Sequence, residues 1–297
     1  MSISAAIVGA AVLLLRAVNI IPRRFIRLLW LAPFLRMTFP FFLNSDVSIL
    51  KPFAAVGMKT VYITELVPYD YTLSPSTANY VQFVNSYRPI IYKEEVFEEV
   101  LGTAGVIWLA VAAALLTAIF ALYFLTLFRL RKSVRLYGNV YVSDRVSSPA
   151  VYGVIRPKII LPESYIGRDV SSVLLHERTH IRHGDNLLRL FAFAAAAVNW
   201  FNPLAWLFLT LFLCDVELAC DERAVSKLGG EDEKKRYAAN ILECVEAKGF
   251  LASAFGGAPL KKRITRILGY KKFHPVLSAV LWAAAAFVLV ALSTNAF

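Results

Sequence analysis

The sequence is short of acidic residues and of cysteines, and each shortage excludes a class of protein. It has 21 Asp and Glu against 32 Lys and Arg, a net charge of +11. Such a charge fits a nucleic-acid-binding protein, but no Lys/Arg stripe alternates with aromatic residues, so direct binding of nucleic acid is not expected. The three cysteines are Cys214, Cys220 and Cys244, an odd number without a C-x-x-C pair. We therefore expect no disulfide framework and a reducing compartment.

Apolar residues are abundant and are gathered into long runs. They make up 58% of the chain, and the mean hydropathy is +0.58, too high for an ordinary soluble domain. About 20 apolar residues cross a bilayer. Four runs approach this length: Ser2–Ile21, Phe25–Leu43, Gly102–Phe128 and Leu277–Leu292. Basic residues follow the first run (Arg23, Arg24 and Arg27) and the third run, and they precede the fourth. This pattern predicts a cell-membrane protein whose first loop lies in the cytoplasm and whose termini both lie outside.

These runs divide the chain into five parts. The predicted parts are 1–43 (two spans and a basic cytoplasmic loop), 44–100 (an outer loop), 101–128 (the third span), 129–275 (a cytoplasmic domain) and 276–297 (the fourth span and a short outer tail). The fold class we expect is mainly α, with four transmembrane helices and a cytoplasmic α+β domain. Arg36, inside the second run, either has a functional role, snorkels to the interface or lines a protein-packed break in the helix.

A fifth apolar stretch, Leu187–Leu213, does not fit a spanning helix. Asn199, Asn202 and Pro203 split it into pieces too short to cross a bilayer. Asn followed by Pro is typical of a helix start. We predict a helical hairpin, buried in the domain core or lying against the inner leaflet.

One pentad, His176-Glu177-Arg178-Thr179-His180, has the H-E-x-x-H pattern. A helix starting near Asp169 or Ser171 and ending near Gly184 would place both imidazoles on one face, where they can bind one ion. Glu177 would stand beside that ion, able to take a proton from a water bound to it. The pattern predicts a zinc site with hydrolytic chemistry.

Two histidines leave a tetrahedral zinc ion without its third protein ligand. Glu217 and Asp221 lie four residues apart beyond the predicted hairpin, which would return them to the pentad. One carboxylate can bind zinc while the other holds a histidine ring. Cys220 is a further possible ligand or a small core residue. His183 is either solvated or beside the ligands, and Asp185 either caps the next helix or orients a histidine.

At these residues the chain resembles the BlaR/MecR-type antirepressor membrane metallopeptidases, which are gluzincins. The resemblance rests on three stretches: 176–185, 217–222, and 142–149 continuing through Gly153, Arg156-Pro157-Lys158 and Leu161-Pro162. The Asn202-Pro203 turn and Lys262-Arg263-Ile264 also fit.

The resemblance implies a set of roles. His176, His180 and Glu217 would bind Zn²⁺, Glu177 would be the general base, and Asp221 would support the ligands. Family members are implied to have four spans, a cytoplasmic protease domain and a homodimeric assembly. They cleave themselves and inactivate a transcriptional repressor, in the context of antibiotic resistance.

Sensors of this family carry an outer penicillin-binding-like domain after the fourth span, whereas this sequence stops at Phe297. We therefore expect the signal to come from a separate sensor protein, the outer loop or the membrane. The segment 249–259 is rich in Gly and Ala, and we place a self-cleavage site at Ser253, Ala254 and Phe255, although a plain linker would look the same.

Several alternatives stay open. A substrate strand could add to the edge of the Val140–Val142 or the Val151–Ile155 strand. The chain could be a non-proteolytic signalling scaffold with a structural zinc site. An intramembrane protease is disfavoured, because the pentad helix is too polar.

Overall fold

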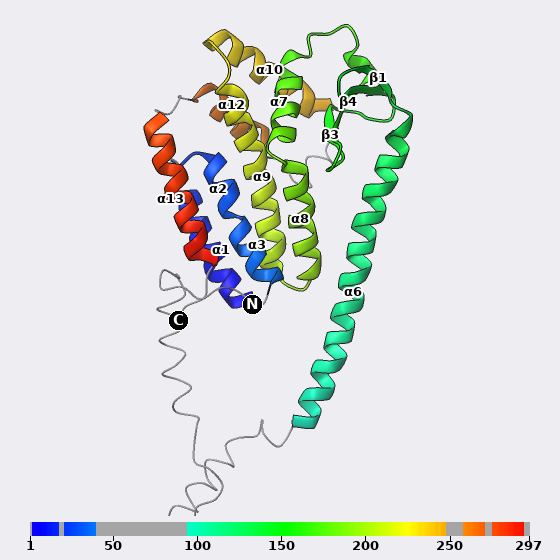
Figure 1. The fold of residues 1–297 in the computed structure, drawn as a ribbon, viewed down its shortest axis with the longest axis vertical. Coiled ribbons are helices and arrows are strands. Elements are labelled where there is room, and N and C mark those ends of the chain that lie inside the picture. Colours follow the sequence, from blue (N-terminus) through cyan, green and yellow to red (C-terminus); the bar gives the residue numbers. More distant parts are fainter. Residues whose placement is uncertain (1, 18–20, 40–93, 248–257, 271–274, 294–297) are drawn as a thin grey trace, which may run out of the picture.

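The computed structural model describes residues 2–17, 21–39, 94–247, 258–270 and 275–293. These residues form a mainly helical fold with one small sheet (Figure 1). The helices are α1 (Ser2–Ala17), α2 (Arg23–Leu29), α3 (Leu31–Thr38), α6 (Glu94–Arg129), α7 (Ser171–Arg182), α8 (Asp185–Val198), α9 (Pro203–Val225), α10 (Glu231–Ala247), α12 (Leu260–Leu268) and α13 (Pro275–Ser293). Helices α1, α2, α3, α8, α9 and α13 run side by side, and α7, α10, α12 and the sheet lie at one end of this bundle (Figure 1).

Two helical stretches of the described chain are long and apolar enough to cross a membrane. They are Gly102–Lys132, mostly α6, and Pro203–Val225, which is α9. Shorter apolar helices cover Ala5–Ala17 and Ala279–Ala291, within the first and fourth predicted spans. Two candidate spans are thus found, and the four predicted ones are not shown.

The second predicted span, Phe25–Leu43, is not one helix in its described part. It is divided between α2 and α3, which meet at Trp30. Pro33 has no N–H to donate to the carbonyl of Leu29, so the helical ladder is interrupted there. Arg36, which follows the break, is 3% exposed and lies inside the protein.

The helix of the third predicted span starts earlier than the sequence suggested. α6 begins at Glu94, inside the predicted outer loop, and has 36 residues. That length corresponds to about 54 Å, well beyond the ~30 Å of a hydrocarbon core. Hydropathy marks only the apolar part of a helix, whereas the backbone hydrogen bonds extend beyond it.

The predicted helical hairpin is confirmed, but the expectation that both arms are too short to cross a bilayer is wrong for the second arm, because Pro203–Val225 is one of the two candidate spans. Helices α8 and α9 pack against each other and are joined by a short turn at residues 199–202. The Asn202 side chain accepts a hydrogen bond from the Leu204 N–H (3.0 Å), and Pro203 occupies the first turn of α9. The second arm is longer than predicted, because α9 continues without a break to Val225 and therefore carries Glu217 and Asp221 on the same helix.

The hairpin is buried among the N-terminal helices. One apolar core joins residues of α1, α2, α3, α8 and α9. Phe208 of α9 lies against Trp30, with ring centroids 5.5 Å apart, and Gly9 of α1 leaves room for the Phe208 ring. The N-terminal segments therefore pack directly on the helices that lead to the candidate site.

The sheet contains β1 (Val134–Tyr137), β2 (Val140–Ser143), β3 (Ala150–Tyr152) and β4 (Lys158–Pro162), in the order β1-β2-β4-β3. β2 pairs antiparallel with β1 and parallel with β4, and β3 pairs antiparallel with β4. The Val140–Val142 strand is therefore interior, and substrate addition there is excluded because both of its edges are occupied. The strand at Val151 is an edge strand.

Candidate metal centre

The local sequence explains why the pentad forms a helix. The Asp169 carboxylate accepts a hydrogen bond from the Ser171 N–H (3.0 Å) at the start of α7. Gly184 ends the helix with φ +64°, a left-handed conformation that glycine adopts without strain. Both predicted boundaries are confirmed. The apolar side of α7, with Val173 and Leu174, packs on the sheet and orients the pentad toward α9.

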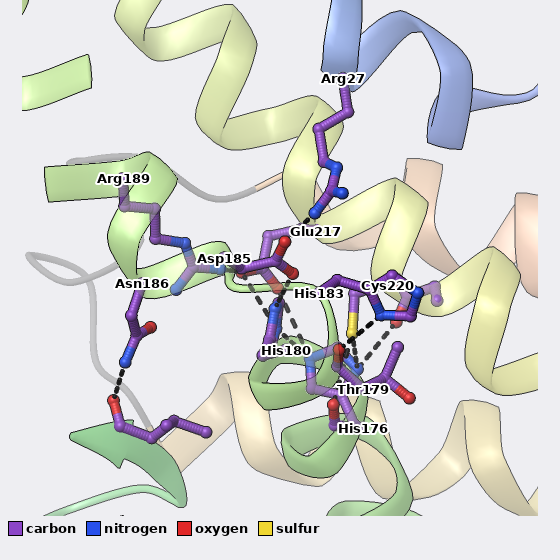
Figure 2. Close-up of polar contacts among 12 residues, drawn as sticks. Arg27, His176, Thr179, His180, His183, Asp185, Asn186, Arg189, Glu217 and Cys220 are labelled. Atoms are coloured by element: carbon purple, nitrogen blue, oxygen red, sulfur yellow. Dashed lines mark hydrogen bonds and ion pairs between the residues drawn. The ribbon is translucent and has the colours of Figure 1, made fainter. Parts of the chain in front are cut away.

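The two pentad histidines and Glu217 converge on one point (Figure 2). The Nε2 atoms of His176 and His180 are 3.1 Å apart. Glu217 oxygens lie 3.7 Å from each of these nitrogens. Nitrogen ligands at 2.0–2.1 Å in a tetrahedral site stand roughly 3.3 Å apart, so this donor set fits one zinc-sized ion. The structure therefore brings together the three residues predicted as ligands.

Cys220 lies close to the histidines but on the wrong side of the ring. The ligand atoms of His176, His180 and Cys220 fall within 4.8 Å of one another. However, the Cys220 Sγ approaches His176 at Nδ1 (3.5 Å), whereas the two histidines face each other through Nε2. An ion between the Nε2 atoms would therefore lie beside Glu217 rather than Cys220.

A buried network surrounds the far side of His176. The His176 Nδ1 lies 2.8 Å from the Tyr237 hydroxyl and 3.3 Å from Asp221 Oδ1. Tyr237 donates to Asp221 (3.0 Å), and Arg263 donates two further bonds to it, at 2.7 and 2.9 Å. All four side chains are buried. This network fixes the plane of the His176 ring.

His180 is held by a different carboxylate. Its Nδ1 lies 2.6 Å from Asp185 Oδ2, and Asp185 in turn accepts a hydrogen bond from Arg27 of α2 (Figure 2). Asp185 is also the first residue of α8. The N-cap of α8 is Gly184, so of the two alternatives for Asp185 the structure bears out the one in which it orients a histidine.

The two histidines differ in proton affinity. Burial and the neighbouring Arg189 guanidinium lower the pKa of His180 well below its usual value, so this imidazole is neutral at pH 7. Burial also acts to lower the pKa of His176, but Cys220, Tyr237 and the Asp221 carboxylate together raise it well above the usual value. The surroundings of the two rings therefore shift their pKa values in opposite directions.

Glu217 is also contacted by two guanidinium groups. Arg189 Nη2 lies 2.5 Å from its Oε1, and Arg263 Nη1 lies 3.4 Å from its Oε2. Glu177 is 7% exposed. The pKa of the Tyr152 hydroxyl is raised first by the burial of Tyr152 itself and then by the nearby negative charge of Glu177. The predicted general base is thus close to the end of the edge strand β3.

A cavity of about 290 Å³ lies between α6, α8 and the end of β3. Its lining includes Tyr152, Arg189 and the apolar side chains Leu122 and Phe193. Asn186 of α8 projects into the same region, where its amide donates to the carbonyls of Val151 (3.0 Å) and Gly153 (3.2 Å). The cavity therefore extends from the edge strand β3 to Arg189, the side chain that contacts Glu217.

Some predicted residues lie elsewhere. The His183 Nδ1 is 2.8 Å from the Thr179 carbonyl of its own helix, so this ring turns back on α7. Ser253, Ala254 and Phe255 lie outside the described residues. Sequence reasoning missed the contributions of Tyr237, Arg27 and Arg189. None of them belongs to a recognisable spacing, although Arg27 shares a helix face with Arg23, four residues before it.

Comparison with known proteins gives one family and several relatives. Residues 1–267 match the model of a family described as BlaR1 peptidase M56. The chain is 30% identical over 161 residues to the regulatory protein BlaR1 of Bacillus licheniformis, covering 50% of this chain and 27% of that protein. It is 29% identical over 110 residues to the methicillin resistance mecR1 protein of Staphylococcus aureus, covering 36% of this chain and 19% of that protein. The matched region thus spans about a quarter or less of these relatives.

Proposed function

This chain belongs to the BlaR1 peptidase M56 family, and on that premise we propose that it is a membrane-embedded zinc metalloendopeptidase. The active site faces the cytoplasm, and the protein spans the cell membrane several times with both termini outside. The positive charge at the end of α6 (Arg129) and just after it (Arg131 and Lys132) supports this orientation.

One observation carries the proposal: two histidine nitrogens of α7 and a carboxylate of α9 lie together, and a second carboxylate, Glu177, lies on α7 beside them. The Nε2 atoms of His176 and His180 are 3.1 Å apart, and each lies 3.7 Å from Glu217. Glu177 adjoins the first of these histidines in the sequence. Three protein ligands with a neighbouring carboxylate are typical of catalytic zinc sites, whereas structural sites use four protein ligands.

The reaction is peptide-bond hydrolysis. Bound zinc would supply a Lewis acid that brings the pKa of water to roughly 7. Glu177 takes a proton from the attacking water and passes it to the leaving amine nitrogen. Asp221 and Tyr237 hold His176, and Asp185 holds His180, each at Nδ1, so that both Nε2 atoms would be available to a bound zinc ion.

We place the substrate along the free edge of β3. An extended peptide can add there through backbone hydrogen bonds. The cavity beside this edge is lined by apolar side chains of α6 and α8, which favours apolar residues in the peptide. Asn186 already occupies the Val151 and Gly153 carbonyls, so a peptide would displace or share that amide.

The biological role we propose is signal transduction. The relatives are named a regulatory protein and a methicillin resistance protein. By analogy, this protein cleaves itself near Ser253–Phe255 and acts on, or upstream of, a cytoplasmic transcriptional repressor. A homodimer and a separate sensor protein complete this proposal.

The test compares the full chain with a Glu177→Gln variant in detergent. We expect both proteins to bind about one zinc ion, because Glu177 is not among the ligands. Only the unsubstituted chain should produce fragments, whose N-terminal sequences identify the cleavage site. Affinity capture on Glu177→Gln should retain the uncleaved substrate, and recovery of a DNA-binding repressor would support the signalling role.

Two results would contradict the proposal. A chain without bound zinc would exclude the metallopeptidase. Signalling output that survives Glu177→Gln unchanged would favour a scaffold with a structural zinc site instead.

A further inference from the structure

The carboxylate that holds His180 is shared between the metal centre and an N-terminal helix. Asp185 is fully buried and uses one oxygen for each side: Oδ2 lies 2.6 Å from His180 Nδ1, and Oδ1 accepts from Arg27. Arg27 is itself 4% exposed, although the sequence suggested a cytoplasmic membrane flank for it. A pair this deeply buried is costly to form, so each member depends on the other.

Helix α2 makes a second attachment close to the site. The Glu222 carboxylate accepts hydrogen bonds from the backbone N–H groups of Arg23 (3.0 Å) and Arg24 (3.2 Å) at the start of α2. Glu222 directly follows Asp221 on α9. The first turn of α2 is therefore bound next to Asp221, which supports His176. The last turn of α2 carries Arg27, which binds Asp185, the residue that supports His180.

The geometry of Asp185 explains why Arg27 matters for the metal ligand. A histidine ligand is oriented by the acceptor of its second ring N–H, and that acceptor must itself be fixed. Arg27 approaches Asp185 from the side opposite His180 (Figure 2). Without this guanidinium, the carboxylate would be buried without a cationic partner and free to turn away from the imidazole.

We propose that Arg27 is a positioning residue for His180, acting through Asp185, and that α2 thereby couples the N-terminal helices to the metal affinity of the site. Helices α1 and α3 pack on each other and on α2, so a displacement of either reaches Arg27. The inference rests on the proposed zinc peptidase function and adds the contact through which that function can be regulated.

The experiment measures zinc affinity of the full chain in detergent by competition with a chromophoric chelator. Arg27→Gln should weaken zinc binding about 10- to 100-fold, the usual effect of losing a partner behind a ligand. Arg27→Lys should restore part of that loss. The matched control is Arg23→Gln, since Arg23 is also a buried arginine of α2 but its side chain contacts Asp215 and the Arg16 carbonyl, not a metal-site residue. This control should bind zinc like the unsubstituted chain.

Two further readouts separate positioning from general destabilisation. The visible absorption of Co²⁺, bound in place of zinc, should change in Arg27→Gln and not in Arg23→Gln, because only the former alters the ligand geometry. In an Asp185→Asn background, Arg27→Gln should cause no further loss of affinity, since the two residues act as one unit.

The inference is overturned if Arg27→Gln binds zinc within twofold of the unsubstituted chain, or if Arg23→Gln weakens binding equally. If Arg27→Gln does not fold, the comparison of Asp185→Asn with the double variant decides: equal affinities support the coupling, and an additional loss refutes it. Failure of the unsubstituted chain to bind zinc or cobalt would instead refute the proposed function.

Discussion

Replacing Arg263 with methionine should strongly destabilise the protein, because it removes the cationic partner of a buried carboxylate. Arg263 is 5% exposed and makes two hydrogen bonds to Asp221, which is 2% exposed. Methionine keeps much of the volume of the side chain and removes its charge. Asp221 would then be buried with Tyr237 and His176 as its remaining partners.

The magnitude follows from the burial of the pair. Removing one partner of a buried ion pair costs about 3–5 kcal/mol, because the remaining charge is left without compensation. That free energy corresponds to a shift of roughly two to three and a half powers of ten in the unfolding equilibrium. Glu217 also loses a guanidinium 3.4 Å away, which adds to the loss.

The assay is denaturant-induced unfolding of the metal-free chain in detergent. The control is Arg168→Met, because Arg168 pairs with Glu243 at the surface, where the two side chains are 54% and 58% exposed. An exposed pair contributes about 0–1 kcal/mol. Adding Asp221→Asn to Arg263→Met should recover part of the stability, because the uncompensated charge is then gone.

A loss below about 1 kcal/mol for Arg263→Met would refute this reasoning, since that is the range of an exposed pair. Failure of Asp221→Asn to recover stability would show that the cost comes from packing rather than from charge.

Three further predictions concern the site and the bundle. Tyr237→Phe removes the hydroxyl 2.8 Å from His176 Nδ1 and should weaken zinc binding about tenfold in a chelator competition; an unchanged affinity would count against the network. Because its buried neighbours raise the pKa of His176, protons compete with zinc for this ring, and chelator competition at several pH values should show zinc affinity falling as the pH falls. A zinc affinity that does not change with pH would contradict this direction. Gly9→Ala would place a Cβ 2.0 Å from the Phe208 ring and should cost about 1–3 kcal/mol in unfolding experiments, whereas Gly105→Ala, with nothing within 4 Å, should be neutral or stabilising.

The helix of the pentad and the hairpin beyond it could be predicted because their signals are local. Asp169 and Gly184 mark the ends of α7, and Asn202-Pro203 marks the start of α9. Once those boundaries are known, the return of Glu217 to His176 follows from the lengths of the two arms. Hydropathy also located α6 correctly, although not its first residue.

The rest of the site depends on contacts between residues far apart in the sequence. Arg27 and Asp185 are separated by 158 positions, and Tyr237 and His176 by 61. Neither pair belongs to a motif whose spacing predicts contact. Arg27 was predicted to lie at the cytoplasmic membrane surface, because an exposed basic residue beside an apolar run usually lies there. The sequence does not show that Arg27 is buried. A break near Arg36 was one of the open alternatives, but the sequence could not decide for it, because a proline in an apolar run can kink a span as well as divide it.

The contact between Asn186 and strand β3 has a consequence for the protein in isolation. An edge strand with unpaired carbonyls is a template on which any extended chain can align, including a second copy of the same strand. The Asn186 amide donates hydrogen bonds to the carbonyls of Val151 and Gly153, so these two carbonyls are not available to pair with another strand. If a substrate adds to this edge as proposed, only a peptide that offers better hydrogen bonds than the Asn186 amide would displace it, which would restrict the peptides that can bind.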